Sequence, residues 1–307
     1  METSLFLKSI LPAFLSLTFI LQDMPGQTSR MDSLISARKL NVIEGSIPLY
    51  CTHEYEKRGT EAQSLLQHII ETYSGDEPGV FQLKLAVIDS SRWSDFPFPY
   101  GFFFIHQGWI VIPADLDFQE FSYLWGYSGF TETLTENLLT VSANPEEFLT
   151  EVLYKFTIAH ELGHYYTEKI LNAAPPDAWT AEWMASYFAT DYLYRNDARA
   201  LEGLNIWEKT YTEEITPKYR SLQDFNTRYA SVGLQNYVWY HCMFQPMIND
   251  IYSEYGTDFM EVFAQTFPRT GDGKKFSLEE LLDILDRITG GRVSCWVEIM
   301  EGNRSES

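Results

Sequence analysis

The sequence has few cysteines, and their spacing fits neither a metal motif nor a redox motif. Only Cys51, Cys242 and Cys295 occur in 307 residues, and no two of them form C-x-x-C. This excludes a zinc finger and a thioredoxin-type site, which both need closely spaced cysteine pairs. Two alternatives remain open: one disulfide beside a free thiol in an exported protein, or three unrelated buried thiols.

Basic residues are also scarce. The chain has 22 Lys and Arg against 43 Asp and Glu, which gives a net charge of −21 at pH 7. Nucleic-acid binding needs a positively charged surface, and anionic membranes attract basic segments. The acidic residues are scattered rather than clustered, which favours a role in solubility. We therefore expect neither nucleic acid nor an anionic membrane surface as a partner.

The apolar segment near the N-terminus is too short for a comfortable transmembrane helix. It runs from Ile10 to Leu21, after Lys8 and before the Pro25-Gly26 pair. This length is typical of a signal-peptide core, so residues 1–26 are a candidate signal peptide or anchor. We expect an exported protein, with membrane contact only through an uncleaved anchor. A buried N-terminal helix is the alternative.

The chain has no internal repeat or low-complexity segment, and its 45% hydrophobic content is that of an ordinary globular core. Apolar periodicity predicts a helix first and then three strands, after which the pattern is mainly helical. Strands followed by helices indicate the α+β class. The predicted helix is 60–73, and the predicted strands are 81–87, 101–105 and 109–113.

The most informative segment is His160-Glu161-Leu162-Gly163-His164, which has the pattern H-E-x-x-H. Four residues of α-helix turn through about 400°, so both imidazoles lie on one face, where a zinc ion can bind them. Glu161 lies about 100° further round the helix, beside the metal, where it can accept a proton from water. The alternative is a buried helix with two core histidines, in which a glutamate would be costly to bury.

Flanking residues support a helix here. Asn144-Pro145 is a start signal, and Asn172 with Pro175-Pro176 marks the end. Between these limits apolar residues recur at every fourth position and lead directly to the histidines. They are Phe148, Val152 and Phe156, with Leu149 and Leu153 alongside.

A catalytic zinc site needs a third protein ligand, and the next predicted helix offers Glu182. Ala185, Ser186 and Ala189 share its face, and such small residues allow close approach to the histidine helix. Asp191 is a weaker alternative ligand, further along the same helix. The competing interpretation of Glu182 is a surface glutamate on an amphipathic helix.

Together these segments resemble the gluzincins, the zinc peptidases whose third ligand is a glutamate. The nearest pattern is that of the peptidase MA-like group, in which H-E-x-x-H is followed by roughly W-x-x-E-G-x-A-x-Y. This chain matches that pattern at Trp179, Glu182, Ala185 and Tyr187, whereas Trp183 replaces the usual glycine.

The resemblance implies a role for each matching residue. His160, His164 and Glu182 become ligands of Zn²⁺, and Glu161 becomes the general base. Where thermolysin-type members carry an aspartate that orients a zinc histidine, this chain has Ser186.

The resemblance also implies a small sheet ahead of the zinc helix, with an edge strand that holds an extended substrate. Trp109–Pro113 is the candidate edge strand, and an ordinary core strand is the alternative. We expect a small, mostly antiparallel sheet followed by a largely helical zincin-type catalytic region. Residues 27–140 form the first part and 141–307 the second, in one catalytic unit.

A long helix is predicted over 235–255, with a kink at Pro246, and a capping box at Ser277 opens an apolar helix that runs to Ile288. In the related enzymes a tyrosine in such a helix donates a hydrogen bond to the tetrahedral intermediate. The register places Tyr240 or His241 in this role, and both can donate to an oxyanion. The alternative is that Tyr237 and Tyr240 are core aromatic residues.

We therefore expect a zinc metallopeptidase acting on a peptide or protein substrate. Related aminopeptidases have a G-x-M-E-N segment that grips the free amine, and the region around Trp125–Gly129 has no such sequence. This favours an endopeptidase. The alternative is an inactive gluzincin-like zinc-binding or interaction module, which would have no need of Glu161.

Overall fold

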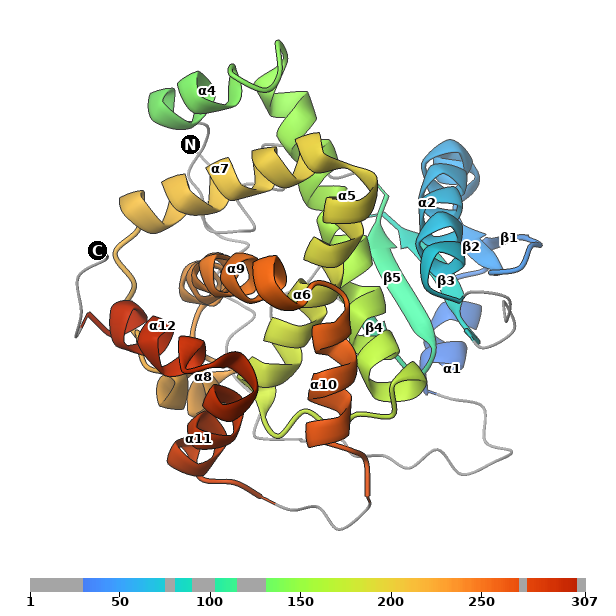
Figure 1. Ribbon diagram of the computed structural model, residues 1–307. Coiled ribbons are helices and arrows are strands. Elements are labelled where there is room, and N and C mark those ends of the chain that lie inside the picture. Colours follow the sequence, from blue (N-terminus) through green and yellow to red (C-terminus); the bar gives the residue numbers. More distant parts are fainter. Residues whose placement is uncertain (1–29, 75–80, 90–102, 115–130, 271–274, 303–307) are drawn as a thin grey trace.

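A computed structural model describes residues 30–74, 81–89, 103–114, 131–270 and 275–302. This part of the chain is mainly helical, with one small sheet to one side (Figure 1), which confirms the α+β class. None of the helices in the described ranges is long and apolar enough to cross a membrane. The predicted N-terminal apolar segment (10–21) and the region around Trp125–Gly129 lie outside the described residues.

The sheet has five strands within the described residues, and it is mixed rather than mostly antiparallel as predicted. The outer pairs β1·β2 and β4·β5 are antiparallel, whereas β2·β3 and β3·β5 are parallel. The parallel pair β2·β3 arises because helix α2 (Glu56–Ser74) returns the chain across the sheet between them. In spatial order the strands are β1 (Asn41–Ile43), β2 (Leu49–Cys51), β3 (Lys84–Ile88), β5 (Trp109–Pro113) and β4 (Phe104–His106).

The predicted edge strand is wrong. Strand β5 pairs with β3 on one side and β4 on the other, and all five of its residues are buried. The edge at this end of the sheet, within the described residues, is β4. The hairpin that joins β4 to β5 was predicted correctly, and it turns at Gln107 and Gly108, both with positive φ.

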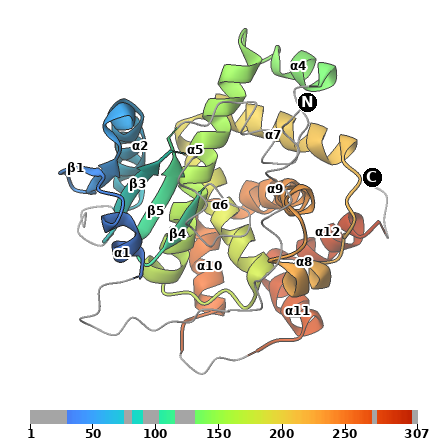
Figure 2. The ribbon, with the colours of Figure 1, turned by 180° about the vertical axis from the view of Figure 1, so that it is seen from behind.

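Alternating side chains of the sheet enter two separate cores. Leu85 and Val87 of β3 face the main core, against α2 and the helical region, while Ala86 and Ile88 face the other way. Helix α1 (Arg30–Ser36) covers this second face, as the view from behind shows (Figure 2). The central strands β3 and β5 thus form a buried layer beside the helices that carry the histidines.

Two long helices form the centre of the molecule. Helix α5 (Pro145–Tyr165) begins at the predicted proline and runs on into a π-helical turn, η5 (Tyr166–Ile170). After the turn at Asn172, helix α6 (Ala178–Asn196) returns beside α5. The predicted start and end of the histidine helix are therefore confirmed, as is the helix that follows.

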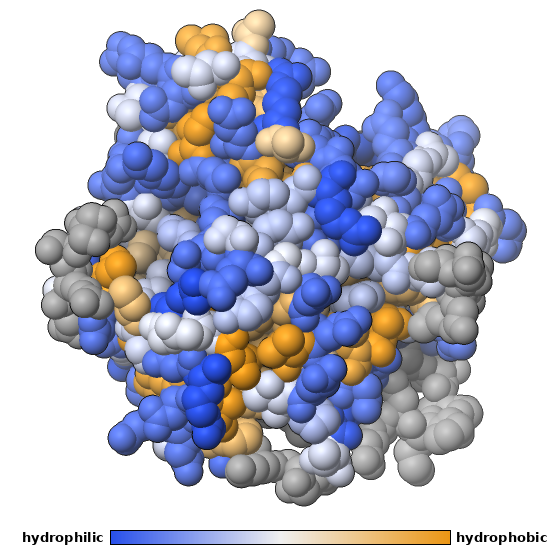
Figure 3. Space-filling model, in the orientation of Figure 1, coloured by the Kyte–Doolittle hydropathy of each residue, from blue (hydrophilic) through white to orange (hydrophobic). Residues whose placement is uncertain are grey.

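The remaining helices surround this pair. The predicted C-terminal helices are confirmed: α9 runs through Pro246, and the capping box at Ser277 opens α11, which ends at the left-handed Gly290. Hydrophilic side chains cover most of the face shown in Figure 3. The surrounding helices are α4 (Glu132–Leu138), α7 (Ala198–Glu214), α8 (Leu222–Arg228), α9 (Leu234–Tyr255), α10 (Asp258–Thr266), α11 (Leu278–Thr289) and α12 (Arg292–Met300).

The three cysteines, all within the described residues, form no disulfide. Cys51 on β2 and Cys242 on α9 are buried, while Cys295 on α12 is exposed. Of the two alternatives left by the sequence, the structure contradicts the disulfide. The other alternative was three buried thiols. Cys51 and Cys242 agree with it, whereas the exposed Cys295 does not.

Candidate metal centre

Helices α5 and α6 approach each other most closely beside the H-E-x-x-H motif. A Cβ atom at Gly163 would lie 2.8 Å from the carbonyl oxygen of Ala185 and 3.0 Å from Cβ of Phe188. Only glycine fits there, because the conflict is with backbone that has little freedom to move. The glycine of the motif and the small residues of α6 therefore bring Glu182 within reach of the two histidines.

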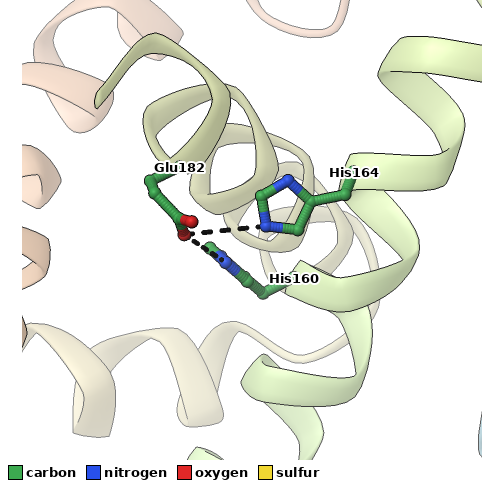
Figure 4. A group of neighbouring side chains, drawn as sticks. All are labelled: His160, His164 and Glu182. Atoms are coloured by element: carbon green, nitrogen blue, oxygen red, sulfur yellow. Dashed lines mark hydrogen bonds and ion pairs between the residues drawn. The ribbon is translucent and has the colours of Figure 1, made fainter. Parts of the chain in front are cut away.

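His160, His164 and Glu182 converge on one point. The Oε2 atom of Glu182 lies 3.1 Å from Nε2 of His160 and 3.6 Å from Nε2 of His164. Figure 4 shows the carboxylate of Glu182 pointing at the ring nitrogens of both histidines. One ligand atom from each residue lies within 4.8 Å of the others, so this group could hold a metal ion.

The spacing of the ligand atoms suits a small tetrahedral cation. Metal–ligand bonds of about 2.0–2.1 Å in a tetrahedron separate adjacent ligand atoms by about 3.3–3.4 Å. The separations of 3.1 and 3.6 Å from Glu182 lie on either side of that value. Two imidazoles and a carboxylate are also the donors that first-row divalent metals accept. The group could therefore hold such an ion.

The Glu182 carboxylate and the His164 imidazole favour opposite charges on each other where the three residues converge. Burial opposes ionisation of Glu182, but His164 and His160 outweigh it and hold the pKa of Glu182 well below its usual range. For His164, burial is likewise outweighed by the Glu182 carboxylate, which raises the pKa of His164 to about 9. A carboxylate that attracts a proton onto the neighbouring imidazole would equally attract a metal cation. With 19% of its side chain exposed, His164 is the most accessible of the three.

Glu161 lies beside the three candidate ligands and is itself buried. Burial raises its pKa, Glu182 adds to this effect, and the two histidines oppose it. The backbone amide of Ile105, on the edge strand β4, faces the Glu161 carboxyl and also lowers its pKa. The predicted general base therefore lies between the group of candidate ligands and strand β4.

Two tyrosines that the sequence analysis did not assign to the site hydrogen-bond Glu182. The hydroxyl of Tyr229 donates to Oε1 at 2.5 Å, and that of Tyr237 donates to Oε2 at 3.1 Å. Burial, followed by the Glu182 charge, raises the pKa of both phenols well above its usual range, so they remain donors. They hold the carboxylate in the orientation that faces the histidines.

Ser186 supplies a partner for the other nitrogen of a ligand histidine. Its Oγ lies 3.2 Å from Nδ1 of His160, which leaves Nε2 of that ring directed at Glu182. An outer-shell partner of this kind fixes the orientation of a ligand imidazole. Ser186 therefore contacts the second ring nitrogen of a candidate ligand.

His241 reaches the site, as predicted, whereas Tyr240 does not. Nε2 of His241 lies 3.5 Å from Oε2 of Glu182, and burial lowers the pKa of His241 to about 3, so its ring is neutral at pH 7. The hydroxyl of Tyr240 instead donates to the carbonyl of Ser221 at 2.8 Å. The structure therefore does not bring Tyr240 to the candidate ligands, because one residue along α9 turns its side chain about 100° away from His241. Tyr237, one helical turn before His241, is the tyrosine on the site face.

Asp191, the weaker alternative ligand, lies elsewhere. Its carboxylate accepts hydrogen bonds from Tyr73, Tyr252 and Thr257. It does not belong to the group of possible ligands formed by the described residues. The structure therefore favours Glu182 as the third ligand.

Comparison with known proteins gave no match of any kind. No family model fits the chain, and no curated protein or solved structure is significantly similar to it.

Proposed function

We propose that this protein is a zinc metallopeptidase of the gluzincin type, which hydrolyses internal peptide bonds of a peptide or protein substrate. The observation that carries this proposal is the convergence of the Glu182 carboxylate with the Nε2 atoms of His160 and His164, beside the buried Glu161. The apolar N-terminal segment supports a further part of the proposal, that the protein is exported.

The three ligand residues would hold Zn²⁺ with a fourth position left for water or substrate. A zinc ion held there would supply Lewis acidity, which would polarise a carbonyl and lower the pKa of a bound water to about 7. A structural zinc site fits less well, because such sites have four protein ligands and are rich in cysteine. Tyr229 and Tyr237 keep the Glu182 carboxylate in place for this role.

Glu161 serves as the general base. It takes a proton from the attacking water and then delivers it to the leaving amine. Its raised pKa suits this exchange, because a carboxylate with a raised pKa binds the proton more tightly before passing it on. The neighbouring strand β4, which ends the sheet among the described residues, would hold an extended peptide next to this carboxylate by adding it as a further strand.

His241 provides a donor for the oxyanion that forms on the substrate carbonyl. Its Nε2 is buried and has no hydrogen-bond partner among the residues that the structure describes. Both site tyrosines are already bonded to Glu182, which leaves His241 as the better candidate. Removing a single donor of this kind from a hydrolase typically costs about 100- to 1000-fold in kcat.

The test combines zinc analysis of the full chain with hydrolysis of a peptide library. We expect one zinc per chain and cleavage within peptides whose ends are blocked. Glu161→Gln should keep the zinc and lose about 100- to 10,000-fold in kcat, because only the proton acceptor is removed. Glu151→Gln, an exposed change on the same helix, is the matched control.

Two results would contradict the proposal in different ways. A chain that takes up no zinc, even when zinc is added, would rule out the metal site. A chain that binds zinc but cleaves no peptide, with Glu161→Gln indistinguishable from the wild type, would identify a zinc-binding module without catalysis.

A further inference from the structure

Ser186 lies between two histidines that belong to different helices. Its Oγ is 3.2 Å from Nδ1 of His160 on α5 and 3.5 Å from Nδ1 of His241 on α9. All three residues are buried, and the two imidazole rings are 5.4 Å apart between centroids. A serine hydroxyl has one proton to donate, so it can donate to only one of these nitrogens and must accept from the other. The two hydrogen bonds that link His160, Ser186 and His241, here called the serine bridge, therefore run in one direction, either from His160 to His241 or the reverse.

A metal on His160 fixes that direction, and at this step the inference rests on the proposed function. A neutral histidine that binds a metal through Nε2 carries its proton on Nδ1. This N–H donates to Ser186, whose hydroxyl proton is then directed at Nδ1 of His241. Since His241 accepts at Nδ1, its own proton is on Nε2.

Without a metal the direction reverses. Nε2 of His160 lies 3.1 Å from Oε2 of Glu182, close enough to donate to the carboxylate. Nδ1 of His160 then accepts from Ser186, and Ser186 accepts from Nδ1 of His241. The Nε2 atom of His241 is left with a lone pair. This agrees with its lack of a hydrogen-bond partner among the described residues, although Glu182 lies 3.5 Å away.

We infer that metal binding at His160 shifts the proton of His241 from Nδ1 to Nε2, and that Ser186 transmits the change. The ring stays neutral, since one proton leaves Nδ1 and one is added at Nε2. The resulting Nε2–H faces the ligand group, where it can donate to an oxyanion on the substrate. Ser186 is thus a positioning residue that prepares the donor only when the metal is bound.

The direct test is the tautomer of His241 with and without Zn²⁺. Correlations between ring nitrogens and ring hydrogens in the full chain, labelled with ¹⁵N-histidine, show which nitrogen carries the proton. The signals that disappear in His241→Gln assign the ring. We expect Nε2–H with one zinc per chain and Nδ1–H after chelation. The same tautomer in both states would overturn the inference.

Ser186→Ala tests the bridge itself. We expect this variant to fold and to bind zinc, but its His241 should no longer change tautomer when zinc is added. The kcat should fall by roughly 10- to 100-fold, as for other outer-shell changes, with KM little altered. Ser186→Thr keeps the hydroxyl and should restore both properties. Ser253→Ala, exposed on α9, is the matched control.

The outcomes separate this inference from the proposed function. A normal tautomer change in Ser186→Ala would overturn the role of the serine, even if zinc binding and hydrolysis are as proposed. A wild-type chain without zinc would overturn the proposed function and the inference together. Zinc content is measured in the same samples, so the two failures are distinguishable.

Discussion

Helix α6 buries one carboxylate in each half, and the neighbours of the two differ in kind. Asp191 accepts from three hydroxyl groups, those of Tyr73 and Tyr252 at 2.5 and 2.9 Å and that of Thr257 at 2.7 Å. Glu182 accepts from two phenols but also faces imidazole nitrogens of His160 and His164.

The difference separates a carboxylate that joins segments of the fold from one that could bind a metal ion. Three hydroxyl groups satisfy Asp191 within the folded chain, with Arg195 of the same helix 3.7 Å from Oδ2. The hydroxyl groups come from α2, α9 and the residue that precedes α10, so this cluster joins distant segments. A histidine nitrogen satisfies Glu182 only when it carries a proton, or when a cation lies between them. Burial therefore does not distinguish these two carboxylates, whereas the chemical nature of the groups around them does.

The largest expected effect comes from exchanging each acid for its amide. Glu182→Gln should weaken zinc binding by more than the 10- to 100-fold typical of outer-shell changes, because it removes a ligand. Asp191→Asn should leave zinc affinity unchanged but lower the free energy of unfolding by about 1–3 kcal/mol, since an amide cannot accept from all three hydroxyls. Zinc titration and urea unfolding of both variants measure the two effects.

Glu182→Gln and Asp191→Asn serve as controls for each other, because both changes are isosteric and lie on the same helix. The comparison fails if Asp191→Asn loses zinc as severely as Glu182→Gln while remaining folded. It also fails if Glu182→Gln keeps wild-type zinc affinity.

A smaller effect is expected from the phenol that holds Glu182. Tyr229→Phe removes the hydrogen bond to Oε1 and should weaken zinc binding by roughly 10- to 100-fold, or about 1.4–2.7 kcal/mol, as the carboxylate loses its fixed orientation. Tyr240→Phe is the matched control, because this buried tyrosine bonds the Ser221 carbonyl away from the site. Equal zinc affinities for the two variants would show that Tyr229 has no part in the metal centre.

Much of this site could be predicted from local sequence, because its core depends on helical periodicity. The spacing of His160 and His164 places both on one helix face, and a short connection followed by small residues brings Glu182 back to them. Tyr237 could also have been found, since it is one turn before His241 on α9. Tyr240, which the resemblance indicated, is next to His241 in the chain and therefore lies on another face of the helix.

Other features depend on tertiary structure that no local pattern encodes. Tyr229 follows α8 in a connection, and its contact with Glu182 arises only from how α8 and α9 pack against α6. The order of strands depends on crossovers, so a buried run such as Trp109–Pro113 fits both an edge and a centre until its partners are known. The sheet was predicted as mostly antiparallel for the same reason.

Another buried carboxylate, that of Glu208, sharpens the comparison, because one of its oxygens has no hydrogen-bond partner among the described residues. Glu208 on α7 is buried, and within the described residues its Oε2 has no hydrogen-bond partner. Burial raises the pKa of Glu208 well above its ordinary value near 4.5. Between these two pKa values the folded chain binds more protons at this residue than the unfolded chain does, so the stability contribution falls as the pH rises. Its slope is at most about 1.4 kcal/mol per pH unit.

Glu208→Gln should remove this slope and make the chain more stable than the wild type above the raised pKa, because a neutral amide needs no desolvation of charge. Urea unfolding across the range from pH 5 to pH 8 measures it, with the exposed Glu202→Gln on the same helix as the control. Parallel pH profiles for wild type and Glu208→Gln would mean that Glu208 is solvated or paired in solution. If the free energy of unfolding loses its pH dependence in Glu208→Gln but not in Glu202→Gln, the burial of Glu208 destabilises the folded chain.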